Sequence, residues 1–356
     1  MDHDIMVNMK NYVNWAILAP GRIANKMSEA MNGIKDGKLK SIDGSKIRLY
    51  AVASRNLERA KDFAAKWHFE KAYGSYEELY NDPEVDAVYI ANPHAFHLES
   101  VLGCLKGGKH VLCEKPAGCS RDQLDKMTSL AREKNLFFME AMWTAFNPTI
   151  AEIKKEIEAG TIGQIKNIDS RFCNRNPYDP NDRNYAPDQA GGALLDLGIY
   201  NIYFAMMLTD FSPITAESSA VRMLKGVDAW NSVNLTFENG IVTSFQSAMD
   251  LPSTVPTHDA VIYGTKGYIT VENFFCTQKA NVYVYKNIQG GDAELTREIR
   301  QPFAVNGYEY ECAHVTKCIL AGKTESDVHT FEKSEALIDM MDALRRDWNF
   351  KYPFES

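Results

Sequence analysis

A short turn near the N-terminus has the residue types of an anion-binding site. An apolar run, Trp15–Ala19, leads through a glycine into an amphipathic stretch. Where a strand runs into a helix, the first free N–H groups of the helix and the positive end of its dipole bind anions such as a pyrophosphate. The usual dinucleotide-binding turn has small residues at three positions, here Ala19, Gly21 and Ala24. Only the middle position must lack a side chain, so one glycine is enough if it is Gly21. An ordinary tight turn is the alternative.

The end of the next apolar run, Ile47–Ser54, indicates which dinucleotide such a turn would hold. Proteins that bind NAD usually have an acidic residue there, which binds the ribose hydroxyls. This chain has Ser54 and Arg55 instead. A guanidinium pairs with two phosphate oxygens and stacks on adenine, which favours NADP over NAD. A solvated arginine at the start of a helix is the alternative.

Composition limits the classes of partner. The chain has 356 residues, a formal net charge of -8 and no lysine- or arginine-rich block, which argues against binding to nucleic acid or to an anionic membrane. Seven cysteines without a CxxC pair or clustered histidines indicate reduced thiols, and neither a disulfide framework nor a metal site is expected. The N-terminus does not resemble a signal peptide, and there is no apolar run of about 18 residues. We therefore expect a cytoplasmic protein.

Two patterns divide the chain. Up to Asn147, short apolar runs of strand length alternate with helical patterns, as in a doubly wound parallel sheet. After a helix at Pro148–Ala159 the stretches are longer and alternate with period two, and Asn239-Gly240 is a strong hairpin signal. The sequence predicts an α/β fold with a Rossmann domain, residues 1–147, and a second α/β domain, residues 148–356, with a large, mainly antiparallel open sheet.

Two further segments resemble the motifs of a known family. Glu114-Lys115-Pro116 follows an apolar strand, and Gly191–Tyr200 contains an aspartate and a tyrosine four residues apart. Both are similar to motifs of the Gfo/Idh/MocA oxidoreductases, and the likeness covers nearly the whole chain. Tyrosine at the second motif is typical of the branch with NADP-dependent trans-dihydrodiol and D-xylose dehydrogenases. The resemblance implies a Rossmann domain and a homodimer formed through the C-terminal sheet. It also implies hydride transfer between NADP(H) and a sugar or vicinal diol.

Lys115, Asp196 and Tyr200 are the expected catalytic residues. Oxidation of a carbinol needs a base for the hydroxyl proton and a donor for the developing charge on oxygen. A tyrosine is a poor base near neutral pH, but a nearby ammonium favours its phenolate. We expect Tyr200 to exchange the proton, Lys115 to lower the pKa of Tyr200 and anchor the reacting oxygen, and Asp196 to bind a substrate hydroxyl or orient the pair. A surface lysine, a core tyrosine and a capping aspartate are the alternatives, and His97 is a rival acid–base group.

The remaining candidates follow from the turn, the strand ends and the family resemblance. The expected cofactor-binding residues are Ala19, Pro20, Gly21, Arg22, Ile23, Ser54, Arg55, Asn92, Pro93, His94, His97, Glu114, Lys115 and Trp143. The polar segment between the two family motifs, with its neighbours, supplies the expected substrate contacts Asn147, Arg171, Tyr178, Arg183 and Asn184.

Two other functions fit the same fold. One is a non-catalytic regulator that binds a nucleotide and a sugar, which an intact Lys115 and Tyr200 disfavour. The other is an NAD-assisted glycosidase, which Ser54-Arg55 disfavours because such an enzyme prefers tightly bound NAD.

Overall fold

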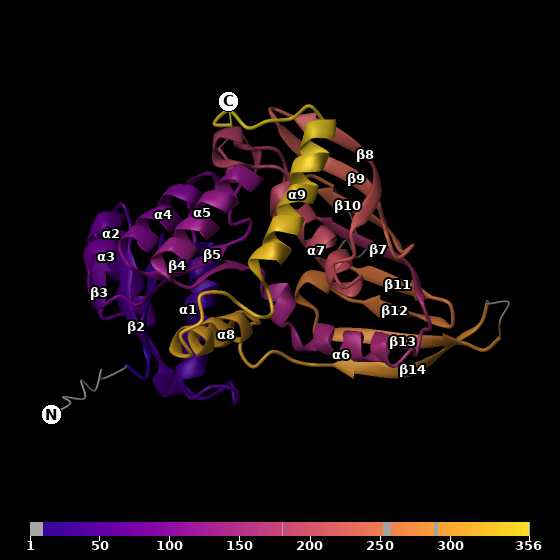
Figure 1. Ribbon diagram of the computed structural model, residues 1–356, viewed down its shortest axis with the longest axis horizontal. Helices are drawn as coiled ribbons and strands as arrows, with labels where there is room; N and C mark the ends of the chain where they lie inside the picture. The colour runs from indigo at the N-terminus through magenta and orange to yellow at the C-terminus, as the bar shows by residue number, and fades with distance from the viewer. Residues whose placement is uncertain (1–9, 180, 252–257, 288–290, 356) are drawn as a thin grey trace.

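The computed structural model describes residues 10–179, 181–251, 258–287 and 291–355. The chain forms two sheets side by side, with α9 between them and α8 beside the first sheet (Figure 1). The described residues include one helical stretch, Pro187–Leu208, that is long and apolar enough to cross a membrane. Its most apolar window is 94% buried inside the protein, as in a core helix.

The first sheet is parallel and has the strand order β3-β2-β1-β4-β5-β6. Every residue of β1 and β4 is buried, because helices cover both faces of the sheet. The reversal of strand order between β1 and β4 creates a crevice at the carboxyl ends of the strands. The strands are β1 (Val13–Leu18), β2 (Ile47–Ala53), β3 (Lys71–Tyr73), β4 (Ala87–Ile90), β5 (His110–Glu114) and β6 (Phe138–Ala141), and the helices are α1 (Arg22–Lys35), α2 (Leu57–Trp67), α3 (Tyr76–Asn81), α4 (His97–Lys106) and α5 (Arg121–Lys134).

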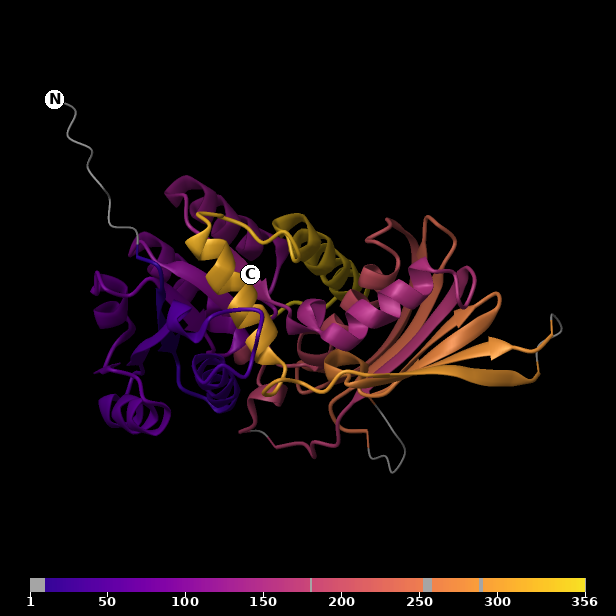
Figure 2. The ribbon, with the colours of Figure 1, turned by 90° about the horizontal axis from the view of Figure 1, so that it is seen from below.

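The second sheet has the strand order β14-β13-β12-β11-β7-β10-β9-β8, antiparallel except between β7 and β10. Alternate residues are buried along β9, β11 and β12, so one face belongs to the core. Among the described residues, helices cover that face and leave the other open (Figure 2). The strands are β7 (Ile165–Cys173), β8 (Ile214–Leu224), β9 (Val227–Phe237), β10 (Val242–Ala248), β11 (Ala260–Gly264), β12 (Gly267–Val271), β13 (Lys279–Tyr285) and β14 (Ala293–Arg300).

Two helices from the C-terminal half pack onto the N-terminal half. The remaining helices are α6 (Pro148–Glu158), α7 (Ile199–Leu208), α8 (Tyr308–Leu320) and α9 (Phe331–Asp347). Trp15 of β1 donates a hydrogen bond to Thr316 of α8 over 3.1 Å, and Arg121 of α5 pairs with Asp339 of α9 over 2.6 Å. The domain boundary at Asn147 stays a prediction. The contacts of α8 and α9 join the residues before this boundary to those after it.

The fold class predicted from the sequence is confirmed, and so is one hairpin, whereas two edge strands and one helical turn differ from the prediction. The β9–β10 hairpin turns at Asn239-Gly240 as expected, with Gly240 at a φ of 80°. Edge strands β3 and β14 were not expected, because β3 has three residues and β14 buries only Ile299 fully. The segment Leu194–Gly198, expected as ordinary α-helix, is a π-helical turn leading into α7. Such turns are frequent at functional sites.

Candidate active site

A cavity of about 1070 Å³, called the cleft below, lies at the carboxyl ends of the parallel strands. It extends from the start of α1 to the π-helical turn before α7. The predicted residues that line it are Ala19, Pro20, Gly21, Arg22, Ile23, Ser54, Arg55, Asn92, Pro93, His94, Glu114, Lys115, Trp143, Arg183, Asp196 and Tyr200.

The glycine turn leaves the start of α1 open to the cleft. Gly21 is the N-cap of α1, and no side chain caps the first N–H groups of the helix. A Cβ atom built on Gly21 has Ala19 O, 3.9 Å away, as its nearest neighbour, so a side chain there would occupy the cleft. Ala19 has a φ of 67°, a left-handed conformation that glycine adopts more easily. An uncapped helix start beside a bare Cα fits a pyrophosphate.

Two arginines flank this turn. Arg55 is exposed and forms no hydrogen bond or ion pair with the part of the chain that the structure describes. Arg59, one turn further along α2, donates two hydrogen bonds to Pro20 O over 3.2 and 2.9 Å. Arg55 is therefore available to an anion in the cleft, whereas Arg59 holds the turn. Arg59 could not be predicted from the sequence, because only the fold brings α2 next to Pro20.

Lys115 and Asp196 form an ion pair at the other end of the cleft. Lys115 Nζ donates to the Asp196 backbone oxygen over 2.6 Å and lies 3.2 Å from Asp196 Oδ1. Arg183 and His94 lie 3.6 and 3.8 Å from the same carboxylate oxygen. Burial raises the pKa of Asp196, but the charges of Lys115 and then Arg183 outweigh burial and hold the pKa below its ordinary value. Asp196 is therefore an anion, and its charge orients the Lys115 ammonium.

His94 is neutral at this end of the cleft. Its Nδ1 lies 3.1 Å from Ala190 O, which can only accept, so Nδ1 carries the proton and Nε2 faces Asp196 without one. Burial lowers the pKa of His94 well below its ordinary value, against the opposing effect of Asp196. His94 thus adds a hydrogen-bond acceptor to the cleft.

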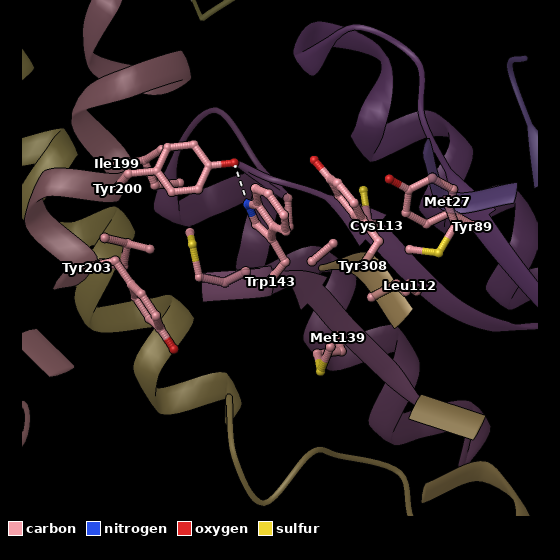
Figure 3. Packing of buried hydrophobic residues seen from close by; sticks show 14 of the residues in the cluster. Met27, Tyr89, Leu112, Cys113, Met139, Trp143, Ile199, Tyr200, Tyr203 and Tyr308 are labelled. Atoms are coloured by element: carbon pink, nitrogen blue, oxygen red, sulfur yellow. Dashed lines mark hydrogen bonds between the residues drawn. The ribbon is translucent and has the colours of Figure 1, made fainter. Parts of the chain in front are cut away.

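Tyr200 faces the cleft with its hydroxyl bonded to Trp143. The Trp143 indole N–H donates to Tyr200 Oη over 3.1 Å, and Tyr203 on the same helix points away from this contact (Figure 3). Lys115 Nζ lies 4.6 Å from the centre of the Tyr200 ring, over its face. Burial, then Glu114, raises the pKa of Tyr200 well above its ordinary value, and Trp143 opposes the rise only in part. The expected lowering of this pKa is therefore absent, and Tyr200 is a neutral phenol.

Aromatic side chains wall this end of the cleft. Trp143 stacks on Tyr308 with ring centres 4.2 Å apart, and Phe172 stacks on Phe275 at the same distance. Of these four, only Trp143 was predicted, because the other three come from β7, the loop before β13 and the start of α8. The cleft also includes residues that the sequence analysis did not select: Asn56, Arg59, Gly74, Ser75, Tyr76, Glu77, Tyr80, Ala91, Phe96, Glu99, Ser100, Phe172, Asn174, Leu197, Phe275 and Tyr308.

A buried aspartate anchors the segment that carries Asp196. Asp228 of β9 accepts hydrogen bonds from Leu194 N over 2.7 Å and from Asn231 over 2.9 Å. Burial raises the pKa of Asp228 to about 7, and these hydrogen bonds and the charge of Arg345 oppose the rise only in part. This anchor fixes the start of the π-helical turn.

Five predicted site residues do not reach the cleft. His97 is fully buried, and its two ring nitrogens lie 2.7 and 2.9 Å from the backbone oxygens of Pro116 and Asn92, so it packs against the loop after β5 and cannot act as the rival acid–base group. Asn147 caps α6, and Tyr178 packs on Tyr185. Arg171 is exposed along β7, and Asn184 lies in a turn closed by Asp182. Among the described residues 171–179 and 181–184, the polar side chains reflect solvent exposure and turn formation, except at Arg183 and Asn174, which line the cleft.

Comparison with known proteins identifies the family. The chain matches a model of the oxidoreductase family with an NAD-binding Rossmann fold at residues 13–142, and the GFO/IDH/MocA C-terminal domain at residues 150–270. Trans-1,2-dihydrobenzene-1,2-diol dehydrogenase of Mus musculus is 33% identical over 348 residues, covering 96% of this chain and 98% of the relative. The Xenopus laevis protein of the same name is 33% identical over 342 residues, covering 95% and 99%.

Solved structures share the fold. KijD10, a 3-ketoreductase from Actinomadura kijaniata in complex with NADP and TDP-benzene, has a TM-score of 0.80 at 24% identity and covers 94% of this chain and 98% of its own. Levoglucosan dehydrogenase in complex with NADH and levoglucosan has a TM-score of 0.82 at 21% identity, covering 96% and 100%. The family models, the full-length relatives and the shared fold agree: the chain belongs to the Gfo/Idh/MocA family of oxidoreductases.

Proposed function

We propose that this protein transfers a hydride between NADP(H) and a carbinol or carbonyl carbon of a sugar or vicinal diol. One observation carries the proposal. A single cleft joins an anion-binding helix start and a free arginine to a buried group of lysine, aspartate and tyrosine. The names of the relatives, which are dehydrogenases of a diol, support a substrate with adjacent hydroxyls.

The residues around Gly21 suit a dinucleotide. The N–H groups at the start of α1 would bind the pyrophosphate, and Arg55 with Ser54 would bind a 2′-phosphate on the adenosine ribose. The nicotinamide of the bound cofactor accepts or gives the hydride. The solved structures with the same fold do not decide between the two cofactors, since KijD10 is solved with NADP and levoglucosan dehydrogenase with NADH. Arg55 is our reason for preferring NADP.

Lys115 is suited to hold the reacting oxygen. An ammonium has three N–H donors, and two of them are directed to Asp196. The third is left for a ligand in the cleft. A fixed positive charge at that place stabilises negative charge that develops on a substrate oxygen, and the buried ion pair holds the lysine in place without reorganisation.

Tyr200 is suited to exchange the proton. Its raised pKa keeps the phenol protonated, so it can give its proton to a carbonyl oxygen during reduction. In the direction of oxidation the phenol first has to lose that proton, and Lys115 over the ring and the Trp143 N–H both stabilise the resulting phenolate. A substrate oxygen between the Lys115 ammonium and the Tyr200 hydroxyl would complete the proton path.

The experiment is to follow the absorbance of the reduced nicotinamide with NADP or NAD across aldoses, inositols, dihydrodiols and, with reduced cofactor, dicarbonyls. We expect turnover with NADP on one of these classes. Cofactor binding without turnover on any of them would favour the regulator. Hydrolysis of a glycoside without net change of the nicotinamide, by protein that co-purifies with NAD, would favour the glycosidase.

We also propose a homodimer formed through the open face of the second sheet. Tyr263, Tyr268 and Tyr283 lie on that face of β11, β12 and β13, and the rings of Tyr268 and Tyr283 stack with centres 4.7 Å apart. Rows of aromatic side chains are enriched at protein interfaces. Sedimentation equilibrium should give twice the chain mass of 40.1 kDa, and Tyr268→Glu should give the monomer.

We also propose that the protein is located in the cytoplasm. Six of the seven cysteines are buried, and the sequence has no CxxC pair. This arrangement is typical of a reducing compartment. Fractionation of the source cells with an antibody to the protein would test it, and recovery from an oxidising compartment would contradict it.

A further inference from the structure

Three side chains with metal-binding atoms meet outside the cleft, at the end of α8. His314 and Cys318 are four residues apart on α8 and therefore lie on one face of the helix. Asp327 reaches them from the connection between α8 and α9. Their nitrogen, sulfur and oxygen atoms all lie within 4.8 Å of one another. No metal site was expected from the sequence, because the histidines and cysteines are not clustered along the chain and only the folded connection adds the aspartate.

The two distances from His314 Nε2 to the other ligand atoms match those around a tetrahedral zinc ion. Cys318 Sγ lies 3.4 Å from His314 Nε2, and Asp327 Oδ1 lies 3.6 Å from the same nitrogen. A tetrahedral Zn²⁺ with bonds of about 2.0 Å to nitrogen and oxygen and about 2.3 Å to sulfur places its ligand atoms about 3.3 to 3.6 Å apart. The side chain of Asp327 is 63% exposed, so it can adjust to complete the geometry.

Hydrogen bonds around the cluster fix the proton on His314. Ser326 Oγ accepts from the N–H groups of Val328 and His329, each over 3.0 Å. The hydroxyl of Ser326 therefore has its proton free to donate to His314 Nε2, 2.8 Å away. Nε2 is then unprotonated, which is the form in which imidazole binds a metal, and on metal binding its one lone pair would pass from the Ser326 hydroxyl to the ion.

We propose that His314 Nε2, Cys318 Sγ and Asp327 Oδ1 bind one Zn²⁺ ion, with water as the fourth ligand. Thiolate and imidazole favour zinc over Mg²⁺ or Ca²⁺, which prefer oxygen ligands. The thiolate and the carboxylate balance the two charges of the ion, and the thiol proton passes to solvent on binding. Lys323 pairs with the other oxygen of Asp327, Oδ2, over 2.8 Å, so it leaves Oδ1 available.

The site would join two elements that support the cleft. Ser326 holds the backbone of His329, and His329 Nε2 lies 3.1 Å from Glu140 Oε2 at the end of β6. The other oxygen of Glu140 accepts from Ala117 N over 2.9 Å, two residues after Lys115. None of the three proposed ligands is among the described residues that line the cleft. We therefore assign the ion a structural role that strengthens the α8–α9 connection.

The experiment uses full-length protein freed of metal with a chelator and then titrated with Zn²⁺ against a chromophoric competing chelator. We expect one equivalent per chain with a Kd of about 10 µM or tighter, and a Tm raised by a few degrees in the presence of Zn²⁺. Co²⁺ in place of Zn²⁺ should give a thiolate-to-cobalt charge-transfer band. Failure of the wild-type protein to bind at that affinity would overturn the proposal.

Three variants assign the ligands. Cys318→Ser should abolish the cobalt band, and Cys318→Ser and Asp327→Asn should each weaken Zn²⁺ binding by about 10-fold or more. Asp327 is exposed, so its variant keeps the test valid if the change at the buried Cys318 disturbs folding. Cys276→Ser is the matched control, because Cys276 is a partly exposed cysteine outside the cluster. Loss of binding in the control, or full binding in both ligand variants, would contradict the assignment.

Discussion

The two ends of the cleft hold charge in different ways. At the cofactor end, Arg55 and Arg59 are exposed, and the N–H groups at the start of α1 are not capped by a side chain. At the other end, the side chains of Lys115 and Asp196 are 9% and 17% exposed and form an ion pair. The first end is left free to attract an anion, whereas the second is fixed before any ligand binds.

This difference separates binding from chemistry. Exposed charges contribute modestly to an interaction, because solvent and salt screen them. A buried pair is costly to break, because the remaining partner is left without compensation. We therefore expect changes at Gly21 and Arg55 to act on cofactor affinity, and changes at Lys115 to act on the rate of the chemical step.

The largest expected effect is that of Lys115→Met. The substitution keeps most of the length of the side chain and removes the charge that holds the reacting oxygen, so kcat should fall by about 10²- to 10⁴-fold. Cofactor affinity, measured by quenching of protein fluorescence, should change little. Asp196→Asn is the matched variant, because it keeps the shape of the partner and removes its charge. Near-normal turnover by Lys115→Met would show that the proposed proton chemistry is wrong.

Gly21→Val should affect the other end of the cleft alone. Gly21 has a φ of -109°, which valine adopts, and beyond the adjoining residues the nearest described atom to the new Cβ is Ala19 O at 3.9 Å. The fold should therefore persist, with unchanged thermal unfolding in the absence of cofactor. Loss of two charge-assisted hydrogen bonds of about 1.5–3 kcal/mol each corresponds to a loss of affinity of about 100-fold or more. If Gly21→Val bound the cofactor as well as the wild-type protein, the phosphate position would have to lie elsewhere.

The same contrast explains which residues could be predicted from the sequence. Gly21, Arg55 and Lys115 each lie within three residues of the end of a buried parallel strand, and the carboxyl ends of such strands meet at one edge. Their places in the cleft depend on local sequence alone. Tyr200 was identified from a motif on an apolar helix, and its place in the cleft was found as expected.

The other residues of the cleft depend on contacts between distant segments. Arg59 lies in the cleft because α2 packs beside Pro20, and Phe275 and Tyr308 reach it from segments far along the chain. His97 and Asn147 have residue types that suit a ligand, yet backbone groups nearby take up their hydrogen bonds. Nor could the pKa of Tyr200 be inferred, because the burial that raises it comes from the whole fold.

Arg55→Ala should separate NADP from NAD. A phosphate–guanidinium pair contributes about 1.5–3 kcal/mol, so NADP affinity should fall by about 10- to 100-fold, while NAD affinity should change by less than about threefold. Arg59→Ala is the control, because Arg59 holds the backbone at Pro20 and its loss should weaken both cofactors equally. An equal loss of both cofactors in Arg55→Ala would remove our reason for preferring NADP. The measurement is a titration of each cofactor by calorimetry.

The smallest expected effect is that of an alanine-to-glycine substitution, which we compare at Ala19 and at Ala190. Ala19 and Ala190 both have left-handed backbone conformations, with φ of 67° and 55°. Such a conformation costs alanine about 1–2 kcal/mol, and glycine removes this cost but adds about 0.4–1 kcal/mol of entropy to the unfolded chain. Ala19 is only partly buried, so Ala19→Gly should raise the free energy of unfolding by about 0.5 kcal/mol. Ala190 is fully buried, and loss of its methyl group costs about 0.8 kcal/mol, so Ala190→Gly should give no gain. Urea unfolding of both variants measures the difference, and an equal gain at both sites would mean that the methyl group of Ala190 adds nothing to the packing around His94.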